Sequence, residues 1–354
     1  MERSGRGVDR LVVLGGVLIA ATSWSQTTPG TNYGPLYDNG DFAVREARAH
    51  EGRCPSNTQC TFDFTASMPT GYSASDAVIT GYWTAWDGST GHRVSAIHFG
   101  VTKISYNSTT GAFVWRVSVE FGSDAPPTPS EMEFNIYATL IVADNSDVKL
   151  TRRTSNCSGD TSALCVDSST FSGVGVSGTP FRQMYMRRID VRTSSGNAID
   201  VERLAWETHY PTPGGTSAAG TTSCGLIGLN SGGNVESIDC AIDLVAFASA
   251  TGAATVSVAN VVNGGTYNGF TYGGGGVSGP SGSVGGFTAL KQLDLTFTGG
   301  KSPLFSFSGG CFDTSWTSSP AYLDYQFFHQ FTEDNSSPWL AYEPYVSCYE
   351  GILP

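Results

Sequence analysis

The clearest pattern in the chain is an alternation of apolar and polar residues over positions 113–121. One face of the segment carries Phe113, Trp115, Val117, Val119 and Phe121, and the other carries Arg116, Ser118 and Glu120. This period of two predicts a half-buried antiparallel strand. Residues 134–140 repeat the pattern after a proline-rich turn, so the two segments are predicted to belong to one sheet.

Strand-like patterns continue along the rest of the chain, and no window of a dozen residues keeps a helical period with caps. They fall at residues 61–64, 77–86, 94–104, 185–191, 204–210, 242–250, 254–262, 289–298, 304–307, 323–331 and 339–349. The alternation slips near Gly100, which predicts a bulge. Many short strands, a high glycine content and a low fraction of charged residues predict an all-β fold, an antiparallel β-sandwich of jelly-roll type, arranged as two sandwich units.

The expected organisation has four parts: a signal peptide at residues 1–25, an N-terminal β-sandwich domain at 26–212, a linker or loop at 213–223 and a C-terminal β-rich domain at 224–354. The first part has a basic start, an apolar run at 11–21 and small residues that suit cleavage after Ser25. A buried helix or a membrane anchor is the alternative for this segment. The linker is rich in Pro, Gly, Ser and Thr, and residues 264–286 are so rich in glycine that a loop is predicted there.

The excess of acidic residues limits the classes of molecule that the protein is expected to bind. The chain has 19 Lys and Arg against 31 Asp and Glu, a net charge of −12. Phosphates would be repelled by such a surface, so a nucleic-acid partner is not expected. After residue 25 no apolar run approaches the length of a membrane span. We therefore expect a secreted, extracellular protein.

Eight cysteines in an exported chain predict disulfide bonds. They fall into four close pairs that each bracket a polar loop: Cys54 with Cys60, Cys157 with Cys165, Cys224 with Cys240, and Cys311 with Cys348. Eight cysteines allow 105 connectivities, among which pairing of these nearest neighbours is the expectation. A metal site is the alternative, although no Cys-x-x-Cys motif occurs. Asn107, Asn156 and Asn335 match the acceptor pattern for N-glycosylation.

Catalytic signatures are not found in the sequence. Residues 173–178 fit a Gly-x-Gly-x-x-Gly pattern, but a strand-like segment follows them where phosphate binding needs a helix. The five histidines form no metal-binding spacing, and there is no Gly-x-Ser-x-Gly elbow. Glu120, Glu133 and Glu207 could supply a hydrolase's carboxylate pair, but a solvated strand face explains them as well.

Two polar segments could offer oxygen ligands to calcium. They are Asp38, Asn39 and Asp41, and Asp144, Asn145 and Asp147. Neither has the spacing of an EF-hand, and turn formation explains both. No cofactor is expected, with calcium kept as a minor possibility.

Aromatic residues give the more informative candidates for ligand binding. Trp83 and Trp86 lead into a polar loop that contains Asp87 and His92, and Trp206 lies on a later strand. Exposed aromatic rings stack on the apolar faces of sugars, while Asp and His hydrogen-bond the hydroxyl groups. Burial of both aromatic faces in a sandwich is the alternative.

The strand order of residues 77–144 resembles that of H-type (discoidin-II-like) lectin domains. The likeness lies in Ala77–Tyr82, in Gly91–Val94, and in the strands that contain Phe113 and Phe134. It implies a six-stranded antiparallel sandwich that binds sugars, usually as a trimer. No sugar-binding residues of that family can be assigned to positions in this chain.

These observations lead to three functional hypotheses. The first is a secreted, non-catalytic protein for carbohydrate binding or adhesion, with a glycan, a cell surface or a matrix component as partner. The second is a structural subunit of an extracellular filament, surface layer or matrix, because strand edges and glycine-rich segments suit formation of a homo-oligomer. The third is a secreted polysaccharide hydrolase, which needs two carboxyl groups facing each other across a groove.

Overall fold

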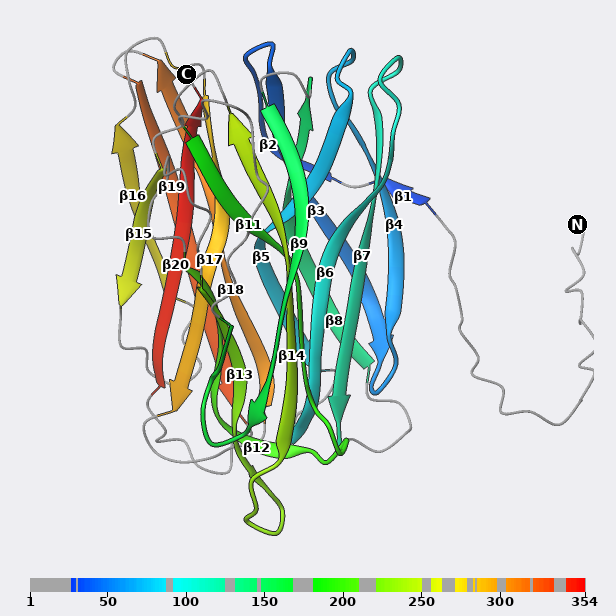
Figure 1. Cartoon of the computed structure of the whole chain (residues 1–354), viewed down its shortest axis with the longest axis vertical. Coiled ribbons are helices and arrows are strands. Elements are labelled where there is room, and N and C mark those ends of the chain that lie inside the picture. Colours follow the sequence, from blue (N-terminus) through cyan, green and yellow to red (C-terminus); the bar gives the residue numbers. More distant parts are fainter. Residues whose placement is uncertain are drawn as a thin grey trace, which may run out of the picture.

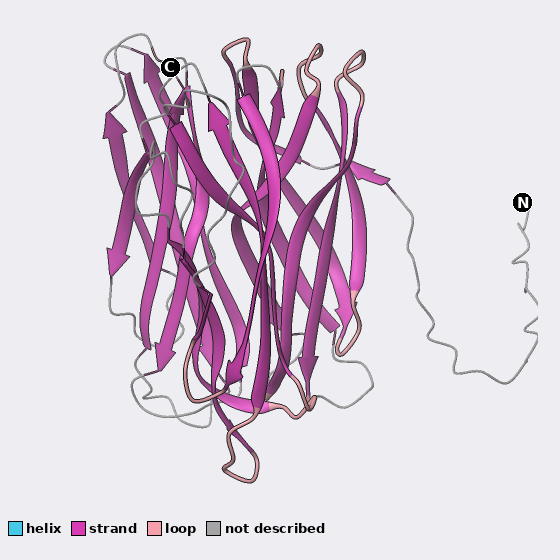
Figure 2. Cartoon of the chain, in the orientation of Figure 1, coloured by secondary structure: helices cyan, strands magenta, loops and turns pink. Residues whose placement is uncertain are grey.

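The computed structural model describes residues 27–29, 31–86, 92–124, 131–144, 148–167, 181–209, 221–249, 256–262, 271–278, 283, 285–297, 304–318, 321–333 and 342–353. In this part of the chain the regular structure consists of strands, and most of them run along the long axis of the molecule (Figure 1, Figure 2). Strands β3–β8 lie on one side in Figure 1 and strands β15–β20 on the other. The predicted all-β class is confirmed.

The strands form two sheets. The 13-stranded sheet contains β1 (Thr27–Pro29), β4 (Cys60–Ser67), β6 (Val94–Tyr106), β7 (Ala112–Ser123), β9 (Val148–Asp160), β10 (Cys165–Asp167), β11 (Phe181–Thr193), β12 (Ile199–His209), β13 (Thr221–Asn230), β14 (Ser237–Ser249), β15 (Val256–Val262), β17 (Gly285–Phe297) and β20 (Tyr342–Leu353). The seven-stranded sheet contains β2 (Thr31–Asp38), β3 (Phe42–Pro55), β5 (Ala74–Trp86), β8 (Glu131–Ala143), β16 (Thr271–Ser278), β18 (Leu304–Ser318) and β19 (Ala321–Glu333).

The pairing of the described strands is antiparallel except between β1 and β4. The seven-stranded sheet has the order β16-β19-β18-β5-β8-β3-β2, and the larger sheet follows β1-β4-β7-β6-β12-β17-β20-β15. A branch of the larger sheet leaves β6 through β11 to β14 and β9. Antiparallel neighbours explain why alternation could be seen in the sequence, since one face of such a strand can meet solvent.

Strand β7 shows the predicted alternation in its clearest form. Its five large apolar residues from Phe113 to Phe121 are buried, while Arg116, Ser118 and Glu120 lie on the half-exposed face. The buried face packs in the main core, where Phe64 lies against Trp115 with ring centroids 5.3 Å apart. In the same core Tyr82 stacks on Phe99 at 4.1 Å. Burial of these large rings stabilises the contact between the two sheets.

A second core covers part of the opposite face of the seven-stranded sheet. It joins residues of β3, β5 and β8 to Tyr185 of β11, to Val245 and Phe247 of β14, and to Ala289 of β17. Phe42 and Phe247 meet there edge to face at 5.0 Å. One end of that face is therefore buried, while the end beyond Thr139 carries the half-exposed residues Tyr137 and Trp83.

Three expectations about the chain's organisation are wrong. The bulges of β6 lie between Val94 and Ala96 and between Lys103 and Ser105, so Gly100 itself stays in register. Residues 271–278 of the predicted glycine-rich loop form β16, because the partner strand β19 supplies a ladder that glycine can join. The predicted linker also overlaps a strand, since β13 begins at Thr221.

The predicted division at residues 213–223 does not separate two sets of sheets. Strands from both sides of it pair with each other, β12 with β17 in the larger sheet and β5 with β18 in the smaller one. Most of the predicted linker, 213–220, lies outside the described residues, as does the predicted signal peptide at 1–25.

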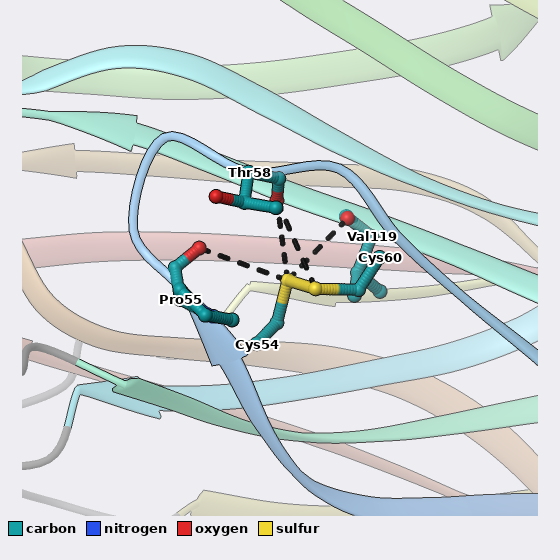
Figure 3. The surroundings of a disulfide bond; sticks show 5 residues. All are labelled: Cys54, Pro55, Thr58, Cys60 and Val119. Atoms are coloured by element: carbon teal, nitrogen blue, oxygen red, sulfur yellow. Dashed lines mark hydrogen bonds between the residues drawn. A yellow bond between two sulfur atoms is a disulfide. The ribbon is translucent and has the colours of Figure 1, made fainter. Parts of the chain in front are cut away.

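Three of the four predicted disulfides are confirmed: Cys54–Cys60, Cys157–Cys165 and Cys224–Cys240. Figure 3 shows the first, which closes the turn between β3 and β4; Sγ of Cys54 lies 3.2 Å from the carbonyl oxygen of Thr58. Cys311 is also disulfide-bonded. Its predicted partner, Cys348, has a side chain outside those described.

Among the described residues, no helix has the length and the apolar character needed to cross a membrane.

Candidate functional site

Among the described residues, the structure does not bring the predicted ligand-binding residues Trp83, His92 and Trp206 together. Trp83 lies half-buried on β5 of the seven-stranded sheet, and His92 lies half-buried just before β6 of the other sheet. Asp87 and the side chain of Trp86 lie outside the described residues.

Trp206 is the clear correction among them. Its side chain is fully buried and meets Phe99 edge to face, with ring centroids 5.1 Å apart. Residues of β12 alternate as predicted, and the face that carries Trp206 points into the main core. Trp206 therefore stabilises the fold and has no exposed ring face to offer to a ligand.

Trp83 belongs instead to a small polar and aromatic surface, here named the Trp83 face. Two register rows define it: His50, Asn135 and Trp83 lie opposite one another on β3, β8 and β5, and Arg48 and Tyr137 lie opposite one another in the next row. Directly opposed residues point to the same side of a sheet, with Cβ atoms about 5 Å apart. His50 is exposed, and Arg48, Tyr137 and Trp83 are half-exposed.

Hydrogen bonds fix the centre of the Trp83 face. Nε and Nη2 of Arg48 donate to Oδ1 of Asn135 at 3.0 and 2.7 Å. Because both donors point at one oxygen, the amide of Asn135 is oriented with Nδ2 turned away from Arg48. The Arg48 guanidinium also lies 5.4 Å from the ring centroid of Tyr137, a cation–π contact.

Gly81 continues the second row beside Tyr137, and Gly310 follows it on β18. Both glycines are buried. The Trp83 face therefore combines two half-exposed aromatic rings and a guanidinium with a fixed amide, Asn135, that is itself 7% exposed. Such a surface can stack on an apolar ring face and hydrogen-bond the groups at its rim.

A second candidate lies on the outer face of the 13-stranded sheet, across β7, β6, β11, β14 and β9. His98, which sequence reasoning left without a role, is buried there although its neighbours Ile97 and Phe99 point to the other side. Its Nε2 lies 2.8 Å from Oγ of Ser118, and its Nδ1 lies 3.3 Å from Oδ2 of Asp190. Serine, histidine and aspartate thus stand in line across three adjacent strands.

Asp190 is shared with a second partner, because Nη2 of Arg192 lies 2.7 Å from its Oδ1. Burial acts to raise the pKa of Asp190, but hydrogen bonds from His98 and Arg192 outweigh it, so the pKa lies below its ordinary value. Arg192 also reaches Oε2 of Glu120 at 3.4 Å. The aspartate is therefore held as an anion within a network of charges.

This alignment lacks the surroundings of a serine nucleophile. Strand β7 pairs with β4 on one side and with β6 on the other, so the N–H groups around Ser118 are used in the two ladders. Acyl transfer needs free donors where the oxyanion forms. The arrangement is better explained as a hydrogen-bonded row that ties three strands together.

A pocket of about 220 Å³ lies next to this row. Its lining consists of Asn156, Cys157, Ser158, Asp190, Arg192, Asp239, Cys240 and Ala241. The hollow has a simple cause: Ala241 lies between Asp190 and Asn156 in register, and its methyl group leaves space that a longer side chain would fill. Hydrogen bonds from the hydroxyl groups of Ser158 and Ser194 lower the pKa of Asp239 at its rim.

The other acidic candidates have structural partners. Glu120 lies 3.4 Å from Arg192 and Glu207 lies 3.7 Å from Lys291, in ion pairs on the sheet surface. Glu133 is exposed. Ion pairs on the sheet surface thus account for Glu120 and Glu207 without a role in hydrolysis.

The first calcium candidate is a turn. Oδ1 of Asn39 accepts hydrogen bonds from the N–H groups of Asp41 and Phe42, both at 3.0 Å, and Oδ1 of Asp38 accepts one from Gly40. These contacts shape the connection between β2 and β3. In the second candidate, Asn145 and Asp147 lie outside the described residues, so only Asp144 is placed.

Two of the three glycosylation patterns are placed by the structure. Asn107 is exposed in the turn between β6 and β7, where its Oδ1 accepts from the N–H of Thr109 and Thr110. Asn156 is exposed on the paired strand β9. Asn335 lies outside the described residues.

Comparisons with known proteins add little. No family model matches the chain, and no curated protein matches it either. Among solved structures it is similar to one described as "The Triple Jelly Roll Fold and Turret Assembly in an Archaeal Virus", with 10% identity, covering 92% of this chain and 90% of that one, at a TM-score of 0.16. A TM-score this low carries no argument about the present chain.

Proposed function

We propose that this chain is a secreted, non-catalytic protein that binds carbohydrate or serves in adhesion, and that the Trp83 face is its binding surface. The observation that carries the proposal is the combination of Trp83 and Tyr137 with the oriented amide of Asn135. Sugars present apolar C–H faces and planar sets of hydroxyl groups. Aromatic rings and amide or guanidinium groups are the side chains that complement both.

Arg48 has a positioning role in this proposal. Its two hydrogen bonds hold Oδ1 of Asn135 and so fix the direction of the Nδ2 donor, which would meet a ligand oxygen at the buried base of the Trp83 face. Because the amide is fixed before binding, little side-chain entropy is lost when the ligand arrives.

A glycan array followed by titration of the best ligand tests the proposal. Trp83→Ala should weaken binding by about 30-fold, as expected for loss of a central aromatic contact of about 2 kcal/mol. Ile104→Ala, at an exposed residue of the other sheet, is the matched control and should leave affinity unchanged. Absence of any glycan ligand for the folded protein, or equal binding by the Trp83→Ala variant, would contradict the proposal.

One observation favours the alternative of a structural subunit. Strand β16 is an edge of the seven-stranded sheet and contains four consecutive glycines, Gly273–Gly276. An edge without bulky side chains can accept a strand from another copy of the chain. Light scattering behind size-exclusion chromatography distinguishes the two ideas, since assembly through β16 should be lost when Gly275→Pro blocks the edge.

A further inference from the structure

The two disulfides Cys157–Cys165 and Cys224–Cys240 lie against each other, and together they form what we name the four-cysteine cluster. Their positions follow from strand register: Cys157 lies opposite Cys240 on β9 and β14, and Cys165 lies opposite Cys224 on β10 and β13. The disulfides then join the two pairs crosswise. Four sulfur atoms from four strands thus converge on one place.

The spacing of the sulfur atoms is close to that of a thiolate metal site. The Sγ atoms of Cys157, Cys224 and Cys240 all lie within 4.8 Å of one another, and Cys165 is bonded to the first of them. Zinc–sulfur bonds of about 2.3 Å place the sulfurs of a tetrahedral site about 3.8 Å apart. Opening the two disulfides lets the sulfur atoms move apart from bonding distance toward this spacing.

The surroundings provide protection and access. Cys165, Cys224 and Cys240 are buried, which keeps water away from three ligands. Cys157 is half-exposed, which gives an ion a path from solvent. Side chains alternate along β9 and β14, so the pocket above Ala241 lies on the opposite face of the sheet from the four sulfur atoms.

We propose that the four-cysteine cluster, when reduced, is a binding site for one thiophilic divalent cation such as Zn²⁺. Each disulfide takes up two electrons and two protons from a dithiol, which closes to its own disulfide. The cation then binds the four sulfurs and displaces up to four protons. Two equivalents of a cyclic disulfide, each reduced to a dithiol by two electrons from the cluster and two protons from solvent, re-form the two disulfides and release the ion. The cluster thus couples the redox state of its surroundings to metal binding.

The test uses the full chain, reduced with a dithiol and desalted under anaerobic conditions. Addition of Co²⁺ should give the absorption of a tetrahedral thiolate complex, which Zn²⁺ displaces at one ion per chain. Cys240→Ser should weaken Zn²⁺ binding by about 100-fold, because one of four ligands is lost. The double variant Cys54→Ser/Cys60→Ser should bind as the unaltered chain does, since that disulfide lies at another turn.

A second measurement tests the proposal on the unaltered chain, in case the reduced Cys240→Ser chain does not fold. Alkylation of the unaltered reduced chain, read by mass spectrometry, should show Zn²⁺ protecting the four clustered cysteines and leaving Cys54 and Cys60 open to modification. Equal protection of all cysteines, no tetrahedral thiolate spectrum, or unchanged affinity in a folded Cys240→Ser variant would overturn the proposal.

Discussion

The buried carboxylate of Asp76 should be among the most sensitive positions of the fold. Asp76 lies on β5 with its side chain 3% exposed, and its Oδ1 accepts a hydrogen bond from the N–H of Ala77 at 2.9 Å. Its Oδ2 lies 2.8 Å from Nε of Arg152, and its Oδ1 lies 3.5 Å from Nε of Arg187. Asp76 of the seven-stranded sheet thus forms ion pairs with two arginines of the larger sheet.

Arg187 is buried at a register shift of β11, which lies between Met186 and Arg188. Burial lowers the pKa of Arg187, and the charge of Asp76 opposes that effect. Removal of Asp76 leaves this guanidinium buried without its acid, a change that costs about 3–5 kcal/mol. Arg152 is half-exposed, so its share of the loss is below about 1 kcal/mol.

The assay is chemical denaturation of Asp76→Ala, of Arg187→Met and of the double variant. We expect Asp76→Ala to lower the free energy of unfolding by about 3–5 kcal/mol, and the double variant to recover most of it because methionine needs no counter-charge. Additive single effects, or a loss below about 1 kcal/mol for Asp76→Ala, would refute this account.

Three further predictions rest on the same structure. Trp206→Ala should lower the free energy of unfolding by about 3–5 kcal/mol, whereas Trp83→Ala should cost about 1 kcal/mol, as measured by denaturant titration. The depressed pKa of Asp190 contributes stability above its unfolded pKa near 3.8 that is lost as the pH falls through the folded pKa, so Asp190→Asn should flatten the decline below about pH 4 seen by thermal unfolding. Ser118 should not react with a fluorophosphonate probe; covalent labelling that His98→Ala abolishes would show a working nucleophile.

The strands and three disulfides could be predicted from the sequence because their signals are local. Alternation in β7 depends on one strand with one buried face, and a short loop limits the partners of Cys54. The glycine-rich strand β16 was missed because its only support is a non-local ladder to β19. Stabilisation by pairing with a strand far away in the sequence cannot be predicted from the residue types of β16 alone.

The candidate sites were predicted less well, and for a related reason. Trp83 is a predicted ligand-binding residue, and Asn135 and Arg48 lie beside it only through the register of β3, β8 and β5. The choice between Trp83 and Trp206 could not be made from periodicity, since both strands alternate and only the packing decides which face is covered. His98 illustrates the same limit, because Ser118 and Asp190 are 20 and 92 positions away in the chain.

The pKa shifts of four carboxyl groups bear on the hydrolase hypothesis. A glycoside hydrolase needs one carboxyl group that keeps its proton near neutral pH, which requires a raised pKa. Among the described acids, hydrogen bonds donated by neighbouring groups hold the pKa values of Asp160, Asp190, Glu236 and Asp239 below their ordinary range. These groups are anions throughout the physiological range. They are poorly suited to protonating a leaving oxygen.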